Sequence, residues 1–476
     1  MTDTFADLLA CEDIVMFANA AIAGTGQREF RSTAAAQRFG LRFLHDYVCG
    51  NYRDVYTAML AIDINDHNAA TIIHTLLATS AQATPQQRRA ERPLIDRRLR
   101  GLPPQRAYKL FHALQRDRVN NRRTRAIIRD YRAARPDPAL DAVKYRAALK
   151  AATRHAHLRL PGEYGTFLYD PLRPARYDTP LLETWRRAHY SASALYDLPL
   201  TVAEGFAAKH GIARTDFLRA IAPAATRGEA LRLQSAAARA DAPALRVDLH
   251  RVPLTRLAGY VLSLDLDERA RRRGELTGAL AAAARTAAGR RAGTWGRTAA
   301  VLDDSYSSFG SPAKRRRPLA VALACHYLLD ALAERHTSHW VSGRTDPLMA
   351  YPRGSSPLAE RVLDALETAP PRLIVVSDGH DDTPDVCASV LSAWRHRVDP
   401  GRATSVTHLN PVFDAEEFTP VRLSPAIPTV GIRAAENLPA LVGLARFAEG
   451  TSGLHDLRSH LADQVERYLA DSGDPR

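Results

Sequence analysis

The sequence predicts an α then α/β protein, in which a helical solenoid is followed by an open parallel sheet with helices on both faces. Over residues 1 to about 290, apolar residues recur three and four positions apart, as on one face of a helix. After a small, polar, glycine-containing stretch, short apolar runs alternate with helical patterns, which is typical of a mostly parallel sheet. We therefore expect a HEAT-like solenoid over 1–290 and a second domain over 296–476.

In the first part, the apolar spacing predicts a series of short helices. Clear examples are "FGLRFLHDYVCGNYRDVYTAMLAID", "QRAYKLFHALQRD" and "LTRLAGYVLSLD". Stretches that contain proline or glycine interrupt the pattern at 101–104, 134–140 and 159–165. Short helices separated by such breaks favour antiparallel pairs stacked as a solenoid, although the sequence has no clear repeat of fixed length.

In the second part, strands and helices are expected to alternate. Apolar runs predict strands at 298–302, 336–342, 372–377, 404–409 and 429–433. Helical patterns follow at 318–333, 356–367, 384–396, 436–448 and 455–470. Pro318 and Ser356 stand where helices commonly begin. Ligands of such sheets bind outside the carboxyl ends of the strands, so the loops at these ends are the candidate site.

Composition limits the class of protein. The 476 residues carry a net charge of +13 with 46% hydrophobic residues, which indicates a globular protein with an acidic partner such as nucleic acid. The four cysteines form no CxxC pair, and Cys325 and Cys387 lie in apolar helical patterns, so we expect buried thiols rather than a zinc site. The N-terminus has acids where a signal peptide needs cations, and the apolar stretch at 318–333 is too short to span a bilayer. A cytoplasmic protein is expected.

Acids and hydroxyls follow two of the predicted strands. Asp303, Ser305 and Ser307 come after the first strand in the spacing D-x-S-x-S, and Asp378 comes after the third. Ser356 lies between them in sequence, just before a helical pattern. Two carboxylates and several hydroxyls form a set of hard oxygen ligands that suits Mg²⁺ or Mn²⁺. Because few of these ligands are charged, the ion would attract an acidic group of a partner.

The three loops, in this order, resemble the metal-ion-dependent adhesion site of a von Willebrand factor A (vWA) domain. The resemblance covers roughly 296–450 and implies that these five residues hold the metal, with Ser355 as an alternative to Ser356. Tyr306 and Ser308 depart from the glycine and methionine that are common in the first loop, and the second loop has serine where threonine is usual. Without a metal, the same residues would be helix N-caps and turn residues.

Four cations at 314–317 precede the helical pattern that begins at Pro318. Cations are mildly disfavoured at the positive end of a helix. We expect them either to be solvated or to contact an acidic partner beside the metal loops.

Residues 88–159 concentrate the positive charge, with 21 Lys and Arg against 6 Asp and Glu. The densest stretch is "RDRVNNRRTRAIIRDYRAA", and "KYRAALKAATRHAHLR" repeats cations at helical spacing. Arginine binds phosphate through two parallel N–H groups, so the concentration of arginine indicates RNA binding by this segment. The alternative is that these charges only form a solvated surface. The side chains expected to bind RNA are Arg122, Arg123, Arg125, Arg129, Lys150 and Arg154.

Aromatic residues lie among these cations. Tyr108, Phe111, Tyr131 and Tyr145 could stack on unpaired bases, although packing inside the helical core is the favoured role of each.

A basic helical region followed by a C-terminal vWA-like domain resembles the Ro (TROVE) family of RNA-binding proteins. In that family, helical repeats form a ring that the vWA domain closes, and the ring binds ends of misfolded RNA and small structured noncoding RNAs. The resemblance implies a ribonucleoprotein scaffold or quality-control protein without catalytic activity.

Two alternatives remain open at this point. One is a vWA adaptor of a MoxR-type AAA ATPase, with a helical platform for proteins and no role in RNA binding. The other is a metal-dependent phosphatase-like enzyme that uses "DDS" with Asp378, His380, Asp381 and Asp382. A haloacid-dehalogenase-like site needs a second Asp where this chain has Ser305, and the sequence contains no Walker A loop and no HExxH motif. An enzyme is therefore not expected.

Overall fold

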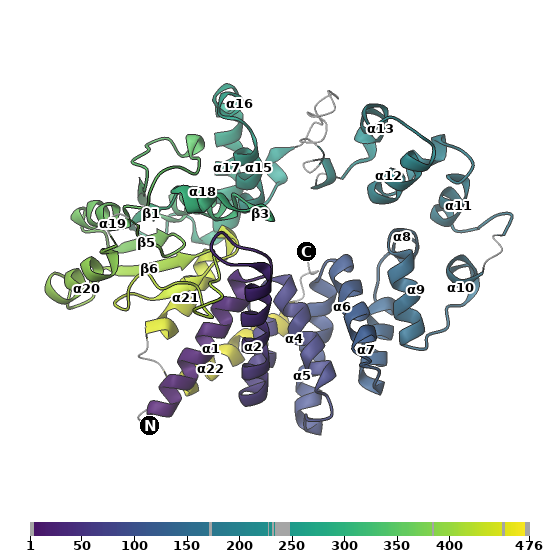
Figure 1. Ribbon diagram of the computed structural model, residues 1–476, viewed down its shortest axis with the longest axis horizontal. Helices are drawn as coiled ribbons and strands as arrows, with labels where there is room; N and C mark the ends of the chain where they lie inside the picture. The colour runs from purple at the N-terminus through teal and green to yellow at the C-terminus, as the bar shows by residue number, and fades with distance from the viewer. Residues whose placement is uncertain are drawn as a thin grey trace. The chain divides into compact units, whose positions relative to one another are not determined.

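The computed structural model describes residues 4–170, 174–226, 228–230, 233, 248–382, 385–449 and 453–471. These residues form two compact units (Figure 1). The sheet unit combines the described residues up to Ile72 with those of Leu249–Asp471, and the helical unit lies within Ile73–Asp248.

The helical unit is a series of short helices that pack on one another. α6 contacts α9, α7 contacts both α5 and α9, and α8 contacts α9, α11 and α12. The helices are α5 (Pro85–Gly101), α6 (Pro104–Arg116), α7 (Arg122–Ala133), α8 (Pro138–Lys144), α9 (Arg146–His155), α10 (Gly162–Tyr169), α11 (Pro180–Arg187), α12 (Leu200–Lys209) and α13 (Arg214–Ile221). This series confirms the predicted helical region.

Capping side chains explain where several of these helices begin. Thr84 and Gln87 form a reciprocal capping box at α5, Asn121 accepts a hydrogen bond from the Thr124 N–H at α7, and Asp137 accepts one from the Leu140 N–H at α8. Each oxygen satisfies an N–H group of the first helical turn, which has no partner within the helix. Asn121 is thus a capping residue.

The sheet unit is built on five parallel strands in the order β4-β1-β5-β6-β7. The strands are β1 (Arg297–Leu302), β4 (Arg335–Trp340), β5 (Arg372–Val376), β6 (Ser405–Asn410) and β7 (Thr429–Gly431), beside a small hairpin of β2 (Gly310–Ser311) and β3 (Lys314–Arg315). Leu302 of β1 lies opposite Trp340 of β4 and Val376 of β5. The carboxyl ends of these three strands therefore meet at one edge, and the predicted α then α/β architecture is confirmed.

Helices cover both faces of this sheet (Figure 1). α18 and α19 both contact β1, β4 and β5, and α20 packs on α19. The helices that follow the strands are α18 (Arg317–Leu332), α19 (Leu358–Glu367), α20 (Cys387–Arg397), α21 (Leu438–Ala445) and α22 (Leu454–Ala470). Cys325 in α18 and Cys387 in α20 are buried, as expected.

Both faces of the central strands are apolar because both are covered. Val301 and Val375 belong to a buried cluster with Val362 of α19 and Leu391 of α20. Their neighbours in sequence point to the opposite face, and Leu302 is fully buried there as well. Continuous burial of this kind is typical of parallel strands between two helical layers.

The first helices of the chain and the last ones before β1 pack with the sheet. α1 contacts β7 and α22, and α15 and α17 contact α18. These helices are α1 (Phe5–Ala23), α2 (Ala34–Asn51), α3 (Arg53–Ala58), α15 (Leu254–Ser263), α16 (Leu266–Arg271) and α17 (Arg273–Ala288), and α4 (Asp66–Ala78) follows α3. The compact units follow packing rather than chain order, and the division into 1–290 and 296–476 stays a prediction.

In the described part of the chain, no helix combines the length and the apolar character needed to cross a membrane.

A buried histidine connects the helices at the N-terminal end of the sheet unit. His45 of α2 lies 2.7 Å from the Tyr56 hydroxyl through Nδ1 and 3.1 Å from Asn68 Oδ1 through Nε2. A neutral ring satisfies both contacts, with Nε2 donating to the amide oxygen and Nδ1 accepting from the hydroxyl. Burial lowers the pKa of His45 to about 4.

Acid is therefore expected to destabilise this helical cluster. The unfolded chain binds a proton on His45 near its ordinary pKa, whereas the folded chain does so only near pH 4, so stability falls as the pH decreases from about 6.5 to 4. The loss approaches roughly 3 kcal/mol for this residue. The free energy of unfolding, measured with urea at several pH values in this range, should fall less steeply with decreasing pH in His45→Gln than in wild type. The exposed His396 provides a control, and equal slopes for wild type and His45→Gln would contradict the assignment.

Candidate functional site

The parallel pairing of β1 and β5 brings Asp303 and Asp378 together. The Asp303 N–H donates to the Val376 carbonyl at 2.9 Å, and both aspartates are buried. Burial, and then the nearby charge of Asp378, raises the pKa of Asp303 to about 7. Two carboxylates buried this close repel each other when both are ionised, which a cation between them would relieve.

The first loop folds back on the Asp303 carboxylate and brings two hydroxyl groups together. The Ser305 N–H donates to Asp303 Oδ1 at 2.8 Å, and the Ser305 and Ser307 Oγ atoms lie 3.2 Å apart. The Tyr306 N–H donates to the Gly354 carbonyl at 3.0 Å, which joins the first loop to the second. Asp303, Ser305 and Ser307 are therefore held side by side.

Ser356 supplies a buried hydroxyl in the second loop. The predicted helix at 356–367 begins only at Leu358, whose N–H donates to Asp381 Oδ1 and not to the Ser356 hydroxyl. Ser356 is 1% exposed, and its Oγ has no hydrogen-bond partner among the described residues. A buried hydroxyl without a partner is costly, so the role of helix cap is wrong for Ser356 and a ligand role remains. Ser355, the alternative ligand, is exposed.

The third loop presents Asp378 on a tightly constrained turn. The His380 N–H donates to Asp378 Oδ1 at 3.2 Å, and Asn410 Nδ2 donates to the Asp378 carbonyl at 2.9 Å. Gly379 has a φ of +84°, and a Cβ there would lie 2.7 Å from the Val421 carbonyl oxygen, so this position needs glycine.

Other acids near these loops have structural partners. Asp381 accepts hydrogen bonds from the Leu358, Val386 and Cys387 N–H groups at 2.8–3.0 Å. Asp304 accepts from the N–H and the hydroxyl of Ser342 at 2.9 and 2.6 Å. These contacts occupy two carboxylates that the phosphatase-like alternative would need as ligands or as a nucleophile.

The donor set fits a hard cation rather than zinc. Among the described residues, no three His, Cys, Asp or Glu side chains are grouped to hold a metal ion, so an ion here depends on hydroxyl ligands as well as the two aspartates. Binding of Mg²⁺ or Mn²⁺ stays a prediction.

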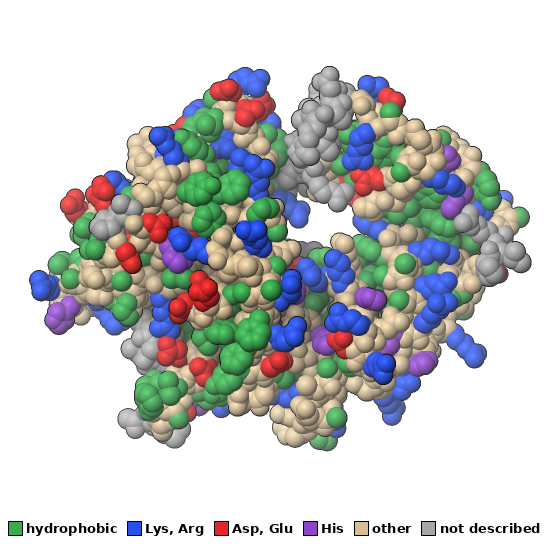
Figure 2. Space-filling model, in the orientation of Figure 1, with side chains coloured by type: hydrophobic (Ala, Val, Ile, Leu, Met, Phe, Trp, Pro, Cys, Tyr) green, Lys and Arg blue, Asp and Glu red, His purple; other side chains and the backbone are tan. Residues whose placement is uncertain are grey.

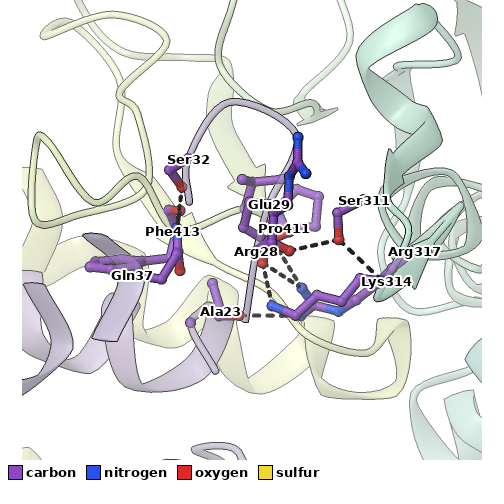
Figure 3. Close-up of polar contacts among 12 residues, drawn as sticks. Ala23, Arg28, Glu29, Ser32, Gln37, Ser311, Lys314, Arg317, Pro411 and Phe413 are labelled. Atoms are coloured by element: carbon purple, nitrogen blue, oxygen red, sulfur yellow. Dashed lines mark hydrogen bonds and ion pairs between the residues drawn. The ribbon is translucent and has the colours of Figure 1, made fainter. Parts of the chain in front are cut away.

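Of the four cations at 314–317, Arg315 is exposed as expected, whereas Lys314 and Arg317 turn toward an acid of the same chain. Lys314 forms an ion pair with Glu29, and both side chains are almost completely buried (Figure 3). Arg317 Nη1 lies 4.0 Å from Glu29 Oε1 and donates to the Pro411 carbonyl at 2.9 Å. The acidic partner of Lys314 and Arg317 is thus Glu29 of the same chain, 285 positions before Lys314.

Hydrogen bonds from side chains to backbone carbonyls also hold this N-terminal segment in place. Ser311 Oγ donates to the Arg28 carbonyl at 2.6 Å, and Gln37 Nε2 donates to the Phe413 carbonyl at 2.7 Å (Figure 3). Gln37 also donates to Ser32 Oγ at 2.6 Å.

This segment also reaches the metal loops. The Phe30 ring packs edge-on against Tyr306, with 5.8 Å between the ring centroids, and Arg31 lies 3.4 Å from Asp382. These residues could not be predicted from the sequence, because no local pattern near residue 29 indicates a contact with a loop almost 300 positions away.

Removal of one partner of the Glu29–Lys314 pair is expected to destabilise the sheet unit. Glu29→Gln leaves a buried ammonium group uncompensated, which typically costs about 3–5 kcal/mol. The double variant Glu29→Gln/Lys314→Met removes both charges and should recover most of that loss. Urea unfolding of Glu29→Gln, Lys314→Met and the double variant tests this. A loss of stability in the double variant equal to the sum of the two single losses would contradict a direct pair.

The predicted RNA-binding arginines of α7 divide into two groups. Arg122 and Arg125 are exposed one helical turn apart, and Arg129 lies one turn further along the same helix. Arg129 is 59% exposed and donates to the neighbouring Asp130 at 2.8 Å. Arg123 instead forms an ion pair with the buried Glu91 at 2.6 Å and is only 12% exposed. Its side chain is thus engaged within the helical unit.

Lys150 and Arg154 lie on α9, which contacts α7. Both cations stand over the Tyr169 ring, at 5.5 and 5.4 Å from its centroid. Tyr169 is half-buried and belongs to α10, so the sequence around the two cations did not indicate it. Figure 2 shows Lys and Arg side chains gathered over the region of α6, α7 and α9.

The interleaved aromatics belong to the core, which was their favoured role. Tyr108, Phe111 and Tyr131 are buried, and their rings contact one another at centroid distances of 5.4–6.2 Å. Tyr145 packs on Tyr108 at 5.3 Å. Stacking of bases on the three buried rings is therefore excluded.

No family model matches the sequence, and no curated protein matches it. The structure is similar to the crystal structure of the Deinococcus radiodurans RO (RSR) protein, with a TM-score of 0.50 and 16% sequence identity. The match covers 92% of this chain and 100% of that chain. The chain has the fold of a Ro protein. The resemblance to Ro proteins that the sequence indicated is thus confirmed at the level of the fold.

Proposed function

We propose that this protein is a noncatalytic RNA-binding scaffold or quality-control protein of Ro type. The observation that carries the proposal is the combination of a Ro fold with a basic surface on α7 and α9. The Ro proteins that the sequence resembles bind noncoding or misfolded RNA. Arg122, Arg125 and Arg154 are exposed and present guanidinium groups suited to phosphate oxygens.

The role of the six predicted RNA ligands differs with their contacts. The exposed Arg122, Arg125 and Arg154 are the primary phosphate ligands, while Arg129, which pairs with Asp130, and the half-buried Lys150 contribute less. Arg123 supports the helix through Glu91 instead of binding RNA.

We further propose a divalent-metal site in the sheet unit. Asp303, Ser305, Ser307, Ser356 and Asp378 would hold Mg²⁺ or Mn²⁺. The ion would supply an electrophilic position for an acidic side chain of a partner protein. The buried carboxylate pair and the unpartnered Ser356 hydroxyl of the described chain support this assignment.

Charge reversal at the exposed arginines is expected to weaken RNA binding. The triple variant Arg122→Glu/Arg125→Glu/Arg154→Glu should lower the affinity for single-stranded RNA at least 10-fold. It should also flatten the dependence of affinity on salt, because fewer counterions are released. Gel-shift titrations at several salt concentrations test this.

The matched control reverses three exposed arginines of the sheet unit, Arg256, Arg285 and Arg290, with the same change in net charge. RNA affinity that is equal in wild type and the α7–α9 variant contradicts the interface. Salt-insensitive or absent RNA binding by the wild type, together with capture of an AAA ATPase, would favour the adaptor function.

Mg²⁺ binding is expected to depend on Asp303 and Ser356. Calorimetric titration should detect binding to wild type, no binding to Asp303→Asn, and weaker binding to Ser356→Ala. Without divalent ions, Asp303→Asn should be at least as stable as wild type, because it removes one of two buried like charges. Asp385→Asn, an exposed acid of the third loop, is the control. Equal heats in wild type and Asp303→Asn would contradict the site.

A further inference from the structure

A pocket opens beside the second metal loop, at the carboxyl end of the edge strand β4. It has a volume of about 830 Å³ and lies entirely within the sheet unit. Its wall consists of residues that follow β4, residues that precede α19 and Arg361 in the first turn of α19. This volume falls within the range of about 300–1,000 Å³ that is common for small-molecule sites. Carboxyl ends of parallel strands are also where such sheets bind ligands.

Arginine dominates the charge of this pocket. Arg344, Arg353 and Arg361 line it, and among the described lining residues Asp346 is the single acid. Asp346 already accepts a hydrogen bond from Arg273 at 2.5 Å. Arg361 is similarly committed, because it donates to Glu360 and Asp364. The positive charge that remains for a ligand therefore comes from Arg353 and, in part, from Arg344, whose Nε lies 3.9 Å from Asp304 Oδ2.

Tyr351 holds these two arginines in place. Arg353 Nη1 donates to the Tyr351 hydroxyl at 3.1 Å, and Arg344 stacks on the Tyr351 ring with its Cζ 4.6 Å from the centroid. The hydrogen bond from Arg353, and then the proximity of Arg344, lowers the pKa of Tyr351. Arg344 Nε also lies 3.9 Å from Oδ2 of the buried Asp304, which holds one side of the guanidinium group and offsets part of its charge.

A buried cation stands behind the pocket wall. Arg269 is 3% exposed and donates to the carbonyls of Leu348 and Ala350 at 3.2 and 2.8 Å, on the segment that carries Met349 into the pocket. Its other hydrogen bonds go to the carbonyls of Leu262 and Leu264. Backbone carbonyls are neutral and do not compensate the positive charge of Arg269, so Arg269 adds to the positive potential of this region.

We propose that this pocket binds a phosphate monoester through Arg344 and Arg353, either on a free nucleotide or at the end of an RNA chain. A guanidinium group presents paired N–H donors to the oxygens of a phosphate, so Arg344 and Arg353 together can bind several oxygens of one phosphate group. The exposed hydroxyl residues Thr345 and Ser355 also line the pocket and can donate further hydrogen bonds. The space beyond the phosphate accommodates a group of the size of a nucleoside.

The site requires neither the divalent metal nor the arginines of α7 and α9, so the test is made in EDTA. AMP and adenosine are titrated into the full chain by calorimetry. Separately, a 5′-phosphorylated oligoribonucleotide and its 5′-hydroxyl counterpart are compared by fluorescence anisotropy. Wild type should bind AMP but not adenosine, or should prefer the phosphorylated RNA at least 5-fold. The first result identifies a free nucleotide as the ligand and the second an RNA end.

Variants distinguish this pocket from the proposed RNA surface. Arg353 is exposed, so Arg353→Gln should keep the fold and lower phosphate-dependent binding several-fold, and Arg344→Gln/Arg353→Gln should abolish it. Arg335→Gln, at the opposite end of β4, is the matched control and should have no effect. The Arg122/Arg125/Arg154 variant should lose RNA affinity but keep AMP binding.

Two results would overturn the proposal. One is that the wild type shows no preference for either phosphorylated probe over its counterpart. The other is that the preference persists in the double variant.

Discussion

The parallel pairing of β1 with β5 is the constraint on which the candidate site depends. Because Leu302 and Val376 are in register, the chain leaves both strands at the same level and places Asp303 beside Asp378 in a buried position. Two acids in such a position are unfavourable when both are ionised, and burial together with the charge of Asp378 raises the pKa of Asp303 to about 7. The second loop adds a buried hydroxyl at Ser356 that makes no hydrogen bond within the described residues. The proposed hard cation would account for both features at once.

The N-terminal segment stabilises the surroundings of this edge. Glu29 neutralises Lys314 inside the protein, while Phe30 and Arg31 contact the first and third loops. The helices that begin the chain are therefore part of the framework of the metal loops. The same edge also carries the arginine pocket, which residues of the second loop help to line, so the proposed metal site and the proposed phosphate site are neighbours.

Much of the sheet unit follows from local sequence patterns. Apolar runs bounded by polar loops identify the five parallel strands to within a few residues, and strand order along the chain places Asp303, Ser305 and Asp378 at one edge. What the sequence does not reveal depends on contacts between distant segments. The burial of Lys314 against Glu29 and the pairing of Arg123 with Glu91 each join residues more than 30 positions apart, so the charge runs alone indicated solvated or ligand-binding cations. Similarly, only the packing of α9 on its neighbours reveals that Tyr169 meets Lys150 and Arg154.

The most direct test of this account is crystallography of the protein soaked in Mn²⁺, with data collected to record the anomalous signal of manganese. We predict a strong anomalous peak between the carboxylates of Asp303 and Asp378, with the Ser356 hydroxyl oxygen among the atoms around it. Electron density without manganese at this position, in which the Ser356 hydroxyl instead donates to a backbone carbonyl, would contradict the assignment of these loops as a metal site.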